Sequence, residues 1–312
     1  MGPAIRIVIR ALSASLLSVV FLAGSAHAHH LLDWTLVDLG VLRPGGQSFA
    51  IAVNNRGDVA GYAQSASGGM HGVLWQNGTL RDIGVPPGTA EVFVNDINDE
   101  GRIVGLSFES QAVTWKDGVW TSLGFLGEAK AIARTGEIAG TTVAGAHERA
   151  VLLREGVLTD LGTLGGLDSR VNAMNDRIHV VGRASLADGS SHAFVWAAGD
   201  MRDLGTLEHR HSVATAINNR DVIVGFAFDE GAAAAPATPF LWYGRMFRLL
   251  PGLTNVFPAA INDRNDIVGS LAAEHGAFLV ADGELVRLHR LSAVQDAHFT
   301  DLTPRAINER RW

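Results

Sequence analysis

The stretch that decides the fold is Ile51-Ala-Val-Asn-Asn-Arg-Gly-Asp-Val-Ala-Gly61, followed by His71-Gly-Val-Leu-Trp75 and Leu80-Arg-Asp-Ile-Gly84. The pattern returns clearly at Ala173-Met-Asn-Asp-Arg-Ile-His-Val-Val-Gly182, with His192-Ala-Phe-Val-Trp196 and Met201-Arg-Asp-Leu-Gly205 after it. It recurs six times, with a period of about 35 to 46 residues. A repeat of this length indicates stacked supersecondary units.

Two intervals inside the repeat are constant. A glycine stands seven residues after the asparagine position, and a strand end stands nine residues after the aromatic position. Two other intervals vary: glycine to aromatic spans 10 to 17 residues, and strand end to the next asparagine position spans 9 to 14. The asparagine positions are Asn54, Asn98, Ala133, Asn175, Asn218 and Asn262; the glycines are Gly61, Gly105, Gly140, Gly182, Gly225 and Gly269; the aromatic positions are Trp75, Trp115, Leu153, Trp196, Trp242 and Val280; the strand ends are Gly84, Gly124, Gly162, Gly205, Pro251 and His289.

Constant spacing is typical of tight hairpins, because turn length and strand register are linked. The first hairpin turns through residues such as Asn54-Asn-Arg-Gly57, and the second through residues such as Gln76-Asn-Gly78. Each repeat therefore predicts four short antiparallel strands, and helical periodicity is absent. We predict an all-β fold, a β-propeller of four-stranded blades, with a solenoid or a sandwich as the competing architectures.

Six repeats are complete, and single strands remain at both ends. Trp34–Gly40 reads as a fourth strand without its blade, and Arg305-Ala-Ile-Asn308 reads as a first strand without its followers. These strands either close a six-bladed ring or form an incomplete seventh blade. The complete repeats span residues 48–84, 92–124, 130–162, 170–205, 213–250 and 258–289.

Residues 1–28 have the pattern of an export signal. Arg6 and Arg10 form a positive segment, residues 11–24 are apolar, and Ala26-His27-Ala28 offers the small residues that a signal peptidase reads. The apolar segment is shorter than the roughly 20 residues of a bilayer span, which argues against an uncleaved membrane anchor. We therefore predict a signal peptide at 1–28.

The rest of the chain, residues 29–312, is predicted to be one propeller-like domain that is secreted or periplasmic, without stable membrane insertion. Loss of Arg6 and Arg10 lowers the formal net charge from −7 to −9, which argues against binding to a phosphate backbone, because that needs clustered cations. The chain has no cysteine, and its 47% of hydrophobic residues can supply a large core instead. We expect a monomer.

The repeat resembles a known family. His192-Ala-Phe-Val-Trp196, Asp160-Leu-Gly-Thr-Leu-Gly-Gly166 and Ala216-Ile-Asn-Asn219 followed by Val224-Gly225 are similar to the HAF repeat, named for its His-Ala-Phe tripeptide. The resemblance covers nearly all of residues 34–312. It implies an exported bacterial repeat protein of uncharacterised function, and it transfers no catalytic residue. Ala133 and Leu153 in the third repeat depart from the pattern, as does the sixth repeat, which lacks the tryptophan.

Three groups of side chains suggest chemistry, and each has a structural interpretation that we favour. His71 and His192 share one repeat position, four before tryptophan, where other repeats carry unrelated residues. Residues 96–101 are similar to a calcium loop, but its twelfth position is Ser107 where such a loop needs glutamate. His209 and His211 would share one strand face and bind a metal, but no third ligand has a recognisable spacing. The repeat tryptophans are predicted to pack between neighbouring blades.

Enzyme signatures are absent from the sequence, so we assign no catalytic, cofactor or metal residue. The two variable intervals emerge on one face of a propeller, where a rigid scaffold would carry binding loops. We predict a non-catalytic binding or scaffolding module for a protein or glycan; the alternative is a propeller hydrolase or lyase acting on polysaccharide. The residues that differ on this face are Gln47, Glu91, Glu128, Asp168, Arg170, His209, His211 and Asn255.

Overall fold

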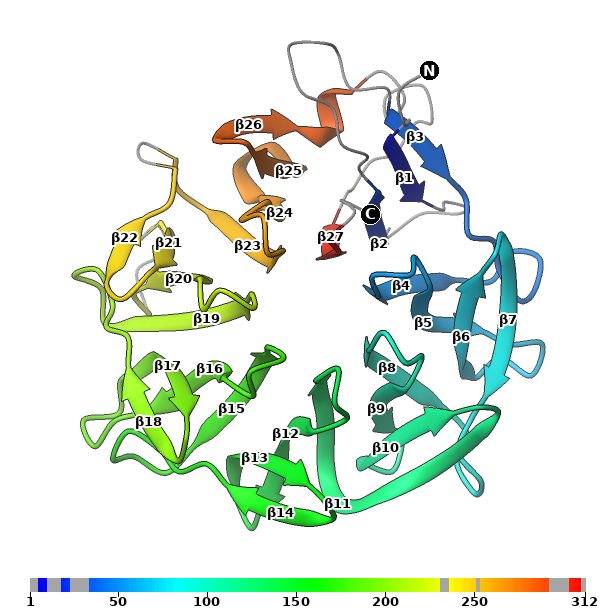
Figure 1. The fold of residues 1–312 in the computed structure, drawn as a ribbon, viewed down its shortest axis with the longest axis horizontal. Helices are drawn as coiled ribbons and strands as arrows, with labels where there is room; N and C mark the ends of the chain where they lie inside the picture. Colours follow the sequence, from blue (N-terminus) through cyan, green and yellow to red (C-terminus); the bar gives the residue numbers. More distant parts are fainter. Residues whose placement is uncertain are drawn as a thin grey trace.

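The chain folds as a ring of β-sheets around a central axis (Figure 1). The structure, a computed structural model, describes residues 5–9, 18–22, 34–230, 236–250, 253–291 and 303–309. Five sheets have four strands each, and one seven-stranded sheet supplies two more blades because the long strand β11 runs from one blade into the next. The predicted all-β propeller of four-stranded blades is confirmed.

The first three blades follow one another from the amino-terminal side of the ring. Blade 1 contains β4 (Ser48–Val53), β5 (Val59–Gln64), β6 (Met70–Gln76) and β7 (Thr79–Gly84). Blade 2 contains β8 (Val92–Ile97), β9 (Ile103–Ser107), β10 (Gln111–Lys116) and the first part of β11 (Val119–Ile132). Blade 3 contains the last part of β11, β12 (Ile138–Ala144), β13 (His147–Arg154) and β14 (Val157–Asp160).

Blades 4 to 6 repeat this order. Blade 4 contains β15 (Ser169–Met174), β16 (Val180–Ser185), β17 (Ser191–Ala197) and β18 (Asp200–Asp203). Blade 5 contains β19 (His211–Ile217), β20 (Ile223–Phe228), β21 (Thr238–Trp242) and β22 (Met246–Arg248). Blade 6 contains β23 (Val256–Ile261), β24 (Ile267–Leu271), β25 (Gly276–Ala281) and β26 (Glu284–Arg287), with the short 3-10 helices η1 (Ala272–Glu274) and η2 (Leu288–Arg290).

The remaining four-stranded sheet, which forms the seventh blade, joins strands from the two ends of the chain. Its order is β27 (Thr303–Ile307), β2 (Ser18–Leu22), β1 (Ile5–Ile9) and β3 (Trp34–Val37). The predicted orphan strands β3 and β27 therefore belong to one sheet, as expected for an incomplete seventh blade. The β1 and β2 strands pair in parallel with them, whereas neighbouring strands within blades 1 to 6 are antiparallel.

Two strands of this sheet, β1 and β2, lie within residues 1–28, the predicted signal peptide. Ile5–Ile9 and Ser18–Leu22 are rich in β-branched residues, which suit strands, and they occupy the places between two strand edges that would otherwise lack partners. Signal-peptide cleavage remains a prediction. The expected cleavage segment at 26–28 lies outside the described residues, as does most of the small-residue loop at 231–237.

The repeated glycine has a steric cause. In each of blades 1 to 6 the inner strand contains a β-bulge, and the glycine of the second strand pairs with the residue just before it, as Gly182 pairs with Val171. A Cβ added at these six glycines would lie 1.9 to 2.3 Å from a carbonyl oxygen of the inner strand. Any larger residue would push the two strands apart.

The repeated asparagine joins one blade to the next. The Nδ2 atom of Asn218 donates to the carbonyl oxygen of Asn262 at 2.9 Å, while its Oδ1 accepts the N–H groups of Arg220 and Val222 within its own turn. We call the set of such residues the asparagine ring. It comprises Asn54, Asn98, Asn175, Asn218, Asn262 and Asn308, with amide-to-carbonyl distances of 2.8 to 3.2 Å. Ala133 holds the seventh position and has no side-chain amide to donate, so the asparagine bond from blade 3 to blade 4 is missing.

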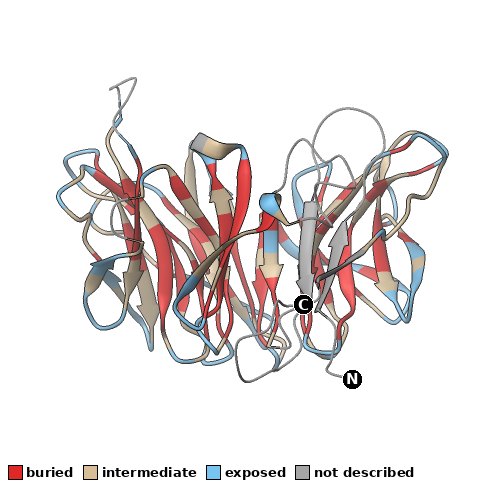
Figure 2. Cartoon of the chain, turned by 90° about the horizontal axis from the view of Figure 1, so that it is seen from above, coloured by how far each residue is buried: buried red, intermediate tan, exposed pale blue. Residues whose placement is uncertain are grey.

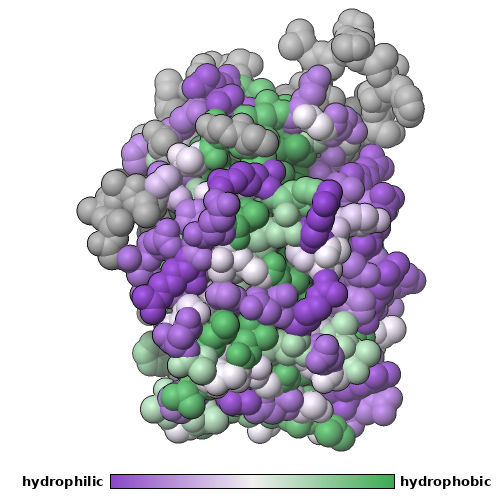
Figure 3. Space-filling model, turned by 90° about the vertical axis from the view of Figure 1, so that its left-hand side faces the viewer, coloured by the Kyte–Doolittle hydropathy of each residue, from purple (hydrophilic) through white to green (hydrophobic). Residues whose placement is uncertain are grey.

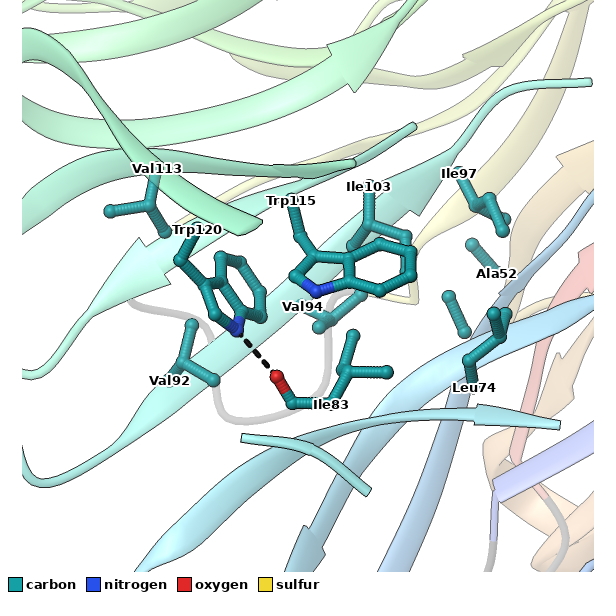
Figure 4. Packing of buried hydrophobic residues seen from close by; sticks show 11 residues of the cluster. Ala52, Leu74, Ile83, Val92, Val94, Ile97, Ile103, Val113, Trp115 and Trp120 are labelled. Atoms are coloured by element: carbon teal, nitrogen blue, oxygen red, sulfur yellow. Dashed lines mark hydrogen bonds between the residues drawn. The ribbon is translucent and has the colours of Figure 1, made fainter. Parts of the chain in front are cut away.

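The hydrophobic core lies between neighbouring blades. Trp115 and Trp120, exposed by only 4% and 8%, pack with Leu74 and Ile83 of blade 1, and the indole N–H of Trp120 donates to the Ile83 carbonyl at 2.8 Å (Figure 4). Trp75, Trp196 and Trp242 are partly buried and pack against core residues that include those of the preceding blade. The predicted role of the tryptophans is confirmed. Seen from the side, buried residues follow the strands and exposed residues gather at the turns on the two faces (Figure 2).

Across the described ranges, no helix is long and apolar enough to cross a bilayer.

Candidate functional site

The ring has two different faces. The fixed-turn face carries the two hairpin turns of each blade, and the second of these has consecutive residues with positive φ, as at Asn77 (52°) and Gly78 (80°). Two such residues define the type I′ turn that a two-residue hairpin prefers. The variable-loop face lies opposite and carries the loops that join the second and third strands and the loops that join successive blades. The length differences read from the sequence therefore all lie on this second face.

The histidines four residues before the repeat tryptophan, His71 and His192, each have a structural partner. His71 Nδ1 lies 3.1 Å from Asp82, and His192 Nδ1 lies 2.8 Å from Asp203. Each aspartate also accepts the N–H of the glycine two residues later, at 2.8 Å in Asp82 and 2.7 Å in Asp203. Arg149 and Asp160 form the corresponding pair in blade 3. The histidine therefore fastens the third strand to the turn that ends the fourth strand, in agreement with the structural interpretation.

Glu128 and Arg170 are the two residues from the predicted set that the structure brings together. The Arg170 guanidinium bridges two carboxylates, Glu128 at 2.9 Å and Glu148 at 3.3 Å, and so connects blade 4 to blade 3. Burial opposes the charge on Arg170, but the two glutamates outweigh it and raise the pKa of the guanidinium above its ordinary value. This arrangement is a fixed ion-pair network at the edge of the variable-loop face.

The other predicted residues have separate partners. Asp168 accepts from the Glu148 N–H at 3.0 Å and lies 3.2 Å from His147 Nδ1. Gln47 and Glu91 contribute backbone carbonyls to loop hydrogen bonds, and Asn255 pairs its backbone and its side chain with Ala237. These contacts hold the loops in place, so the residues are structural supports of the face.

The two histidines of the predicted metal pair face different neighbours. His209 lies in the loop before β19 and contacts Asp229 and Thr238, whereas His211 begins β19, is 4% exposed and accepts the Ser191 N–H at 3.1 Å. The expectation that they share a strand face was wrong, because the strand starts only at His211. Within the described residues, no group of three or more His, Cys, Asp or Glu side chains has the geometry to hold a metal ion.

The contacts of His209 have the order of an acid, a base and a hydroxyl group. Asp229 Oδ2 lies 3.0 Å from Nδ1, and Thr238 Oγ1 lies 2.9 Å from Nε2. Asp229 accepts a hydrogen bond from the Arg210 N–H and contacts His209. Both interactions lower the pKa of Asp229, so this carboxylate is charged. Thr238, however, lies inside a blade and is 7% exposed, so a substrate has no access to its hydroxyl. The contacts of His209 therefore join its loop to the strand that carries Thr238.

Exposed apolar side chains were missed by the sequence reasoning. Phe108, Leu126, Val143 and Leu167 are exposed by 65%, 56%, 52% and 62%, and all four lie in the variable intervals of blades 2 to 4. We call them the apolar patch. The only signal in the sequence was their position, because large apolar residues are unusual in loops that face water.

Backbone pairing shows that the patch follows adjacent segments. The Gly127 N–H bonds to Ser110 beside the Phe108 turn, and Gly127 also pairs with Thr142, so Leu126 lies beside Val143. Val143 pairs in turn with Glu148, whose N–H bonds to Asp168 next to Leu167. By contrast, the outer side of the ring near β18 and β22 shows apolar residues interspersed with polar ones (Figure 3).

Asp96, the first residue of the rejected calcium loop, is a partly buried carboxylate in the joint between blades 2 and 3. Its two oxygens accept the N–H groups of Ile97 at 2.8 Å and Ile132 at 2.9 Å. Burial raises the pKa of Asp96 to about 6, although these N–H groups and Lys130 act in the opposite direction. Alanine stands at the equivalent place in the other blades, so this charge is particular to one joint.

No protein-family model matches the sequence, and no curated protein matches it. Its fold is similar to that of a streptogramin B lyase, with a TM-score of 0.55 and 13% identity over 86% of this chain and 89% of the other. The β-propeller domain of the Trilobed protease from Pyrococcus furiosus, described as having an open velcro topology, gives a TM-score of 0.56 at 9% identity and covers 81% of this chain and 84% of its own.

TolB from Acinetobacter baumannii gives a TM-score of 0.50 at 10% identity. That match covers 73% of this chain, which spans 62% of the TolB chain. Identities this low carry a fold and no function. The similarities therefore show that the chain is a β-propeller and assign it no activity.

Proposed function

We propose that the chain is an exported, non-catalytic binding module that recognises a protein partner through its variable-loop face. The apolar patch carries this proposal. Four large apolar side chains, each more than half exposed, follow one another across three blades of a rigid ring. Large exposed apolar side chains gathered on neighbouring segments, unlike single scattered ones, support an interaction site.

The chemistry of the patch favours a protein over a glycan. Sugar rings stack on flat aromatic surfaces, and Phe108 is the single aromatic residue among the four. The Arg170 network with Glu128 and Glu148 lies at the edge of the patch. An apolar centre with a charged rim is the usual anatomy of a protein interface.

The scaffold fits a binding role. The asparagine ring and the packing between blades fix the blades relative to one another, so little ordering entropy of the scaffold is lost when a partner binds. The predicted signal peptide would bring the domain to the periplasm or the exterior, where a cysteine-free ring draws its stability from its core.

Site-specific photo-crosslinking tests the proposal. A photoreactive amino acid is placed at Leu126, inside the patch, or at Val157, which is 64% exposed at the start of the outer strand β14. Irradiation of cells that produce the protein natively should give a discrete adduct from position 126 and none from position 157. Phe108→Ser should abolish the adduct. Equal adducts from both positions, or none from position 126, would contradict the proposal.

A further inference from the structure

The fixed-turn face contains a pocket of about 320 Å³ between blades 2 and 3. Three cationic side chains, Arg102, Lys116 and Arg134, line it together with one carboxylate, Glu100. Asn98, Thr135 and Gly136 complete the wall. The pocket therefore has a formal surplus of two positive charges, in a chain whose net charge is −7.

The pocket coincides with departures from the repeat. The residue after the asparagine position usually accepts a backbone N–H from the preceding blade, as Asp263 accepts from Asn219 at 2.6 Å. Blade 3 has Arg134 there, and arginine has no acceptor. Four residues after the asparagine position, Asp58 and Asp266 stand in blades 1 and 6, whereas blade 2 has Arg102. Arg134 stands where the other blades have a carboxylate or an amide, and Arg102 stands where three blades have a carboxylate and blades 4 and 5 have His179 and Val222.

The cations of the pocket are available to a ligand. Arg134 uses its backbone N–H to bond Asp176, but none of the described residues forms a hydrogen bond or ion pair with the guanidinium of Arg134 or of Arg102. Lys116 donates to the Glu100 carbonyl and lies 3.8 Å from the exposed Asp117. Two arginines elsewhere on this face do form ion pairs, Arg56 with Asp58 and Arg177 with Asp221.

We propose that this pocket binds a small phosphate monoester carried on a polyhydroxylated molecule. A phosphate monoester has a charge near −2 at neutral pH, which matches the surplus of the pocket. Guanidinium groups bind phosphate oxygens through two parallel hydrogen bonds, and a lysine adds a mobile donor. Glu100 repels the phosphate group but accepts hydrogen bonds from the hydroxyl groups of the ligand, so it orients the ligand in the pocket. The volume lies at the lower end of the range for small-molecule sites.

This site lies on the face opposite the apolar patch, so it is independent of the proposed protein partner. It also differs from a nucleic-acid surface, because its cations are confined to one pocket of an acidic protein. A sugar carboxylate is the closest competing ligand, and the experiment distinguishes it by its lower charge.

Isothermal titration calorimetry with glucose 6-phosphate, inorganic phosphate, glucuronate and glucose tests the proposal on the whole chain. Glucose 6-phosphate should bind saturably at one site and more tightly than the other three. Arg102→Asp and Arg134→Asn should each weaken it about tenfold to a hundredfold, the usual effect of losing a charge-assisted hydrogen bond. Both replacements occur at the same turn positions of other blades, at Asp58 and Asn55, so the fold should be kept.

Arg220→Asn is the matched control. Arg220 is an exposed arginine of the blade 5 turn, away from the pocket, and its loss changes the net charge as Arg134→Asn does. This variant should bind glucose 6-phosphate as the unmodified chain does. An equal loss in Arg220→Asn, no saturable binding, or equal affinity for glucuronate or inorganic phosphate would overturn the assignment. Melting curves of all three variants check that each is folded.

Discussion

The Nδ2 atom of Asn308 donates a hydrogen bond of 2.8 Å to the carbonyl oxygen of Asn54, although the two residues are 254 positions apart. Beside this bond, the Glu309 N–H donates to Asn55 Oδ1 at 3.0 Å. The same two bonds join neighbouring blades elsewhere, as between blades 5 and 6. The end of the chain therefore meets the beginning through the contact that each repeat uses, and this contact closes the ring.

The asparagine ring should contribute strongly to stability. Asn218→Ala removes the donor to Asn262 and leaves two N–H groups of its own turn, that of Val222 buried and that of Arg220 partly buried, without an acceptor, so it should lower the free energy of unfolding by about 2–4 kcal/mol. Urea denaturation measures the change. A loss below about 0.5 kcal/mol would show that the ring is incidental.

The gap in the ring permits the reverse test. Ala133 has the same backbone turn as the asparagines, with its N–H bonded to Glu137 and its carbonyl bonded to Gly136. Ala133→Asn should supply the missing link to blade 4 and raise the free energy of unfolding by about 0.5–1.5 kcal/mol. Destabilisation by this variant would argue against a general role for the asparagine.

The bulge glycines should not tolerate a methyl group. A Cβ at Gly182 would lie 1.9 Å from the Arg170 carbonyl oxygen, so Gly182→Ala should cost about 3 kcal/mol or more. Gly189→Ala is the control, because Gly189 has a positive φ of 82° but no atom within 4 Å of the added Cβ. Its cost should stay near 1–2 kcal/mol. Thermal unfolding of both variants would show similar losses if steric conflict at the bulge were unimportant.

Asp96 should make stability depend on pH. Its folded pKa of about 6 lies above the ordinary value of 3.8, so the native state binds the proton more tightly than the unfolded state between these values. Stability contributed by this group is therefore lost as pH rises through about 4 to 6. Relative to Asp96→Asn, the unmodified chain should gain about 2 kcal/mol between pH 7.5 and pH 4.5.

Chemical denaturation at both pH values measures this difference. Comparing the two proteins cancels the titration of groups other than Asp96. If the difference between them does not change with pH, the carboxylate is already ionised in the native state at low pH and the account of this joint is wrong.

The His-Ala-Phe histidine should be replaceable. In blade 2, Gln111 holds the position of the histidine and Ser122 holds the position of the aspartate. In blade 4, the aspartate that His192 contacts is partly exposed. His192→Gln should therefore change the free energy of unfolding by less than about 1 kcal/mol, as is usual for exposed polar pairs. It should leave the Leu126 crosslink intact. Loss of that crosslink in a stable variant would assign the histidine a binding role.

The fold was largely predictable because the same sequence pattern recurs in each blade. Each blade contains the same two hairpins, so the constant intervals in the sequence indicated where their turns lie. The reason for the glycine was not visible, because the bulge that excludes a Cβ lies on another strand. The function of Asn218 was also hidden, since its partner Asn262 is 44 residues away. Asparagine was expected as a turn former, and the structure shows that it also binds the next blade.

The candidate sites were less predictable for two reasons. Interval lengths indicated the variable-loop face, but polar residues such as Asp168 and Asn255 bond within their loops, whereas apolar Leu126 stays exposed. The pocket lies on the face where spacing is constant, so spacing carried no signal there. Comparing residue types at equivalent turn positions, above all Arg102 and Arg134, would have indicated it. The pairing of β1 and β2 within the ring was also outside what hydropathy shows.

Closure of the ring is tested most directly by a disulfide. The chain has no cysteine, so Asn55→Cys combined with Glu309→Cys places two thiols at the joint between the chain ends. Under mild oxidation, the folded protein should form this crosslink nearly completely, seen as a faster band in non-reducing electrophoresis. Asn55→Cys with Arg220→Cys, on a distant blade, should form none. Failure of the first pair to crosslink in folded protein would contradict the closed ring.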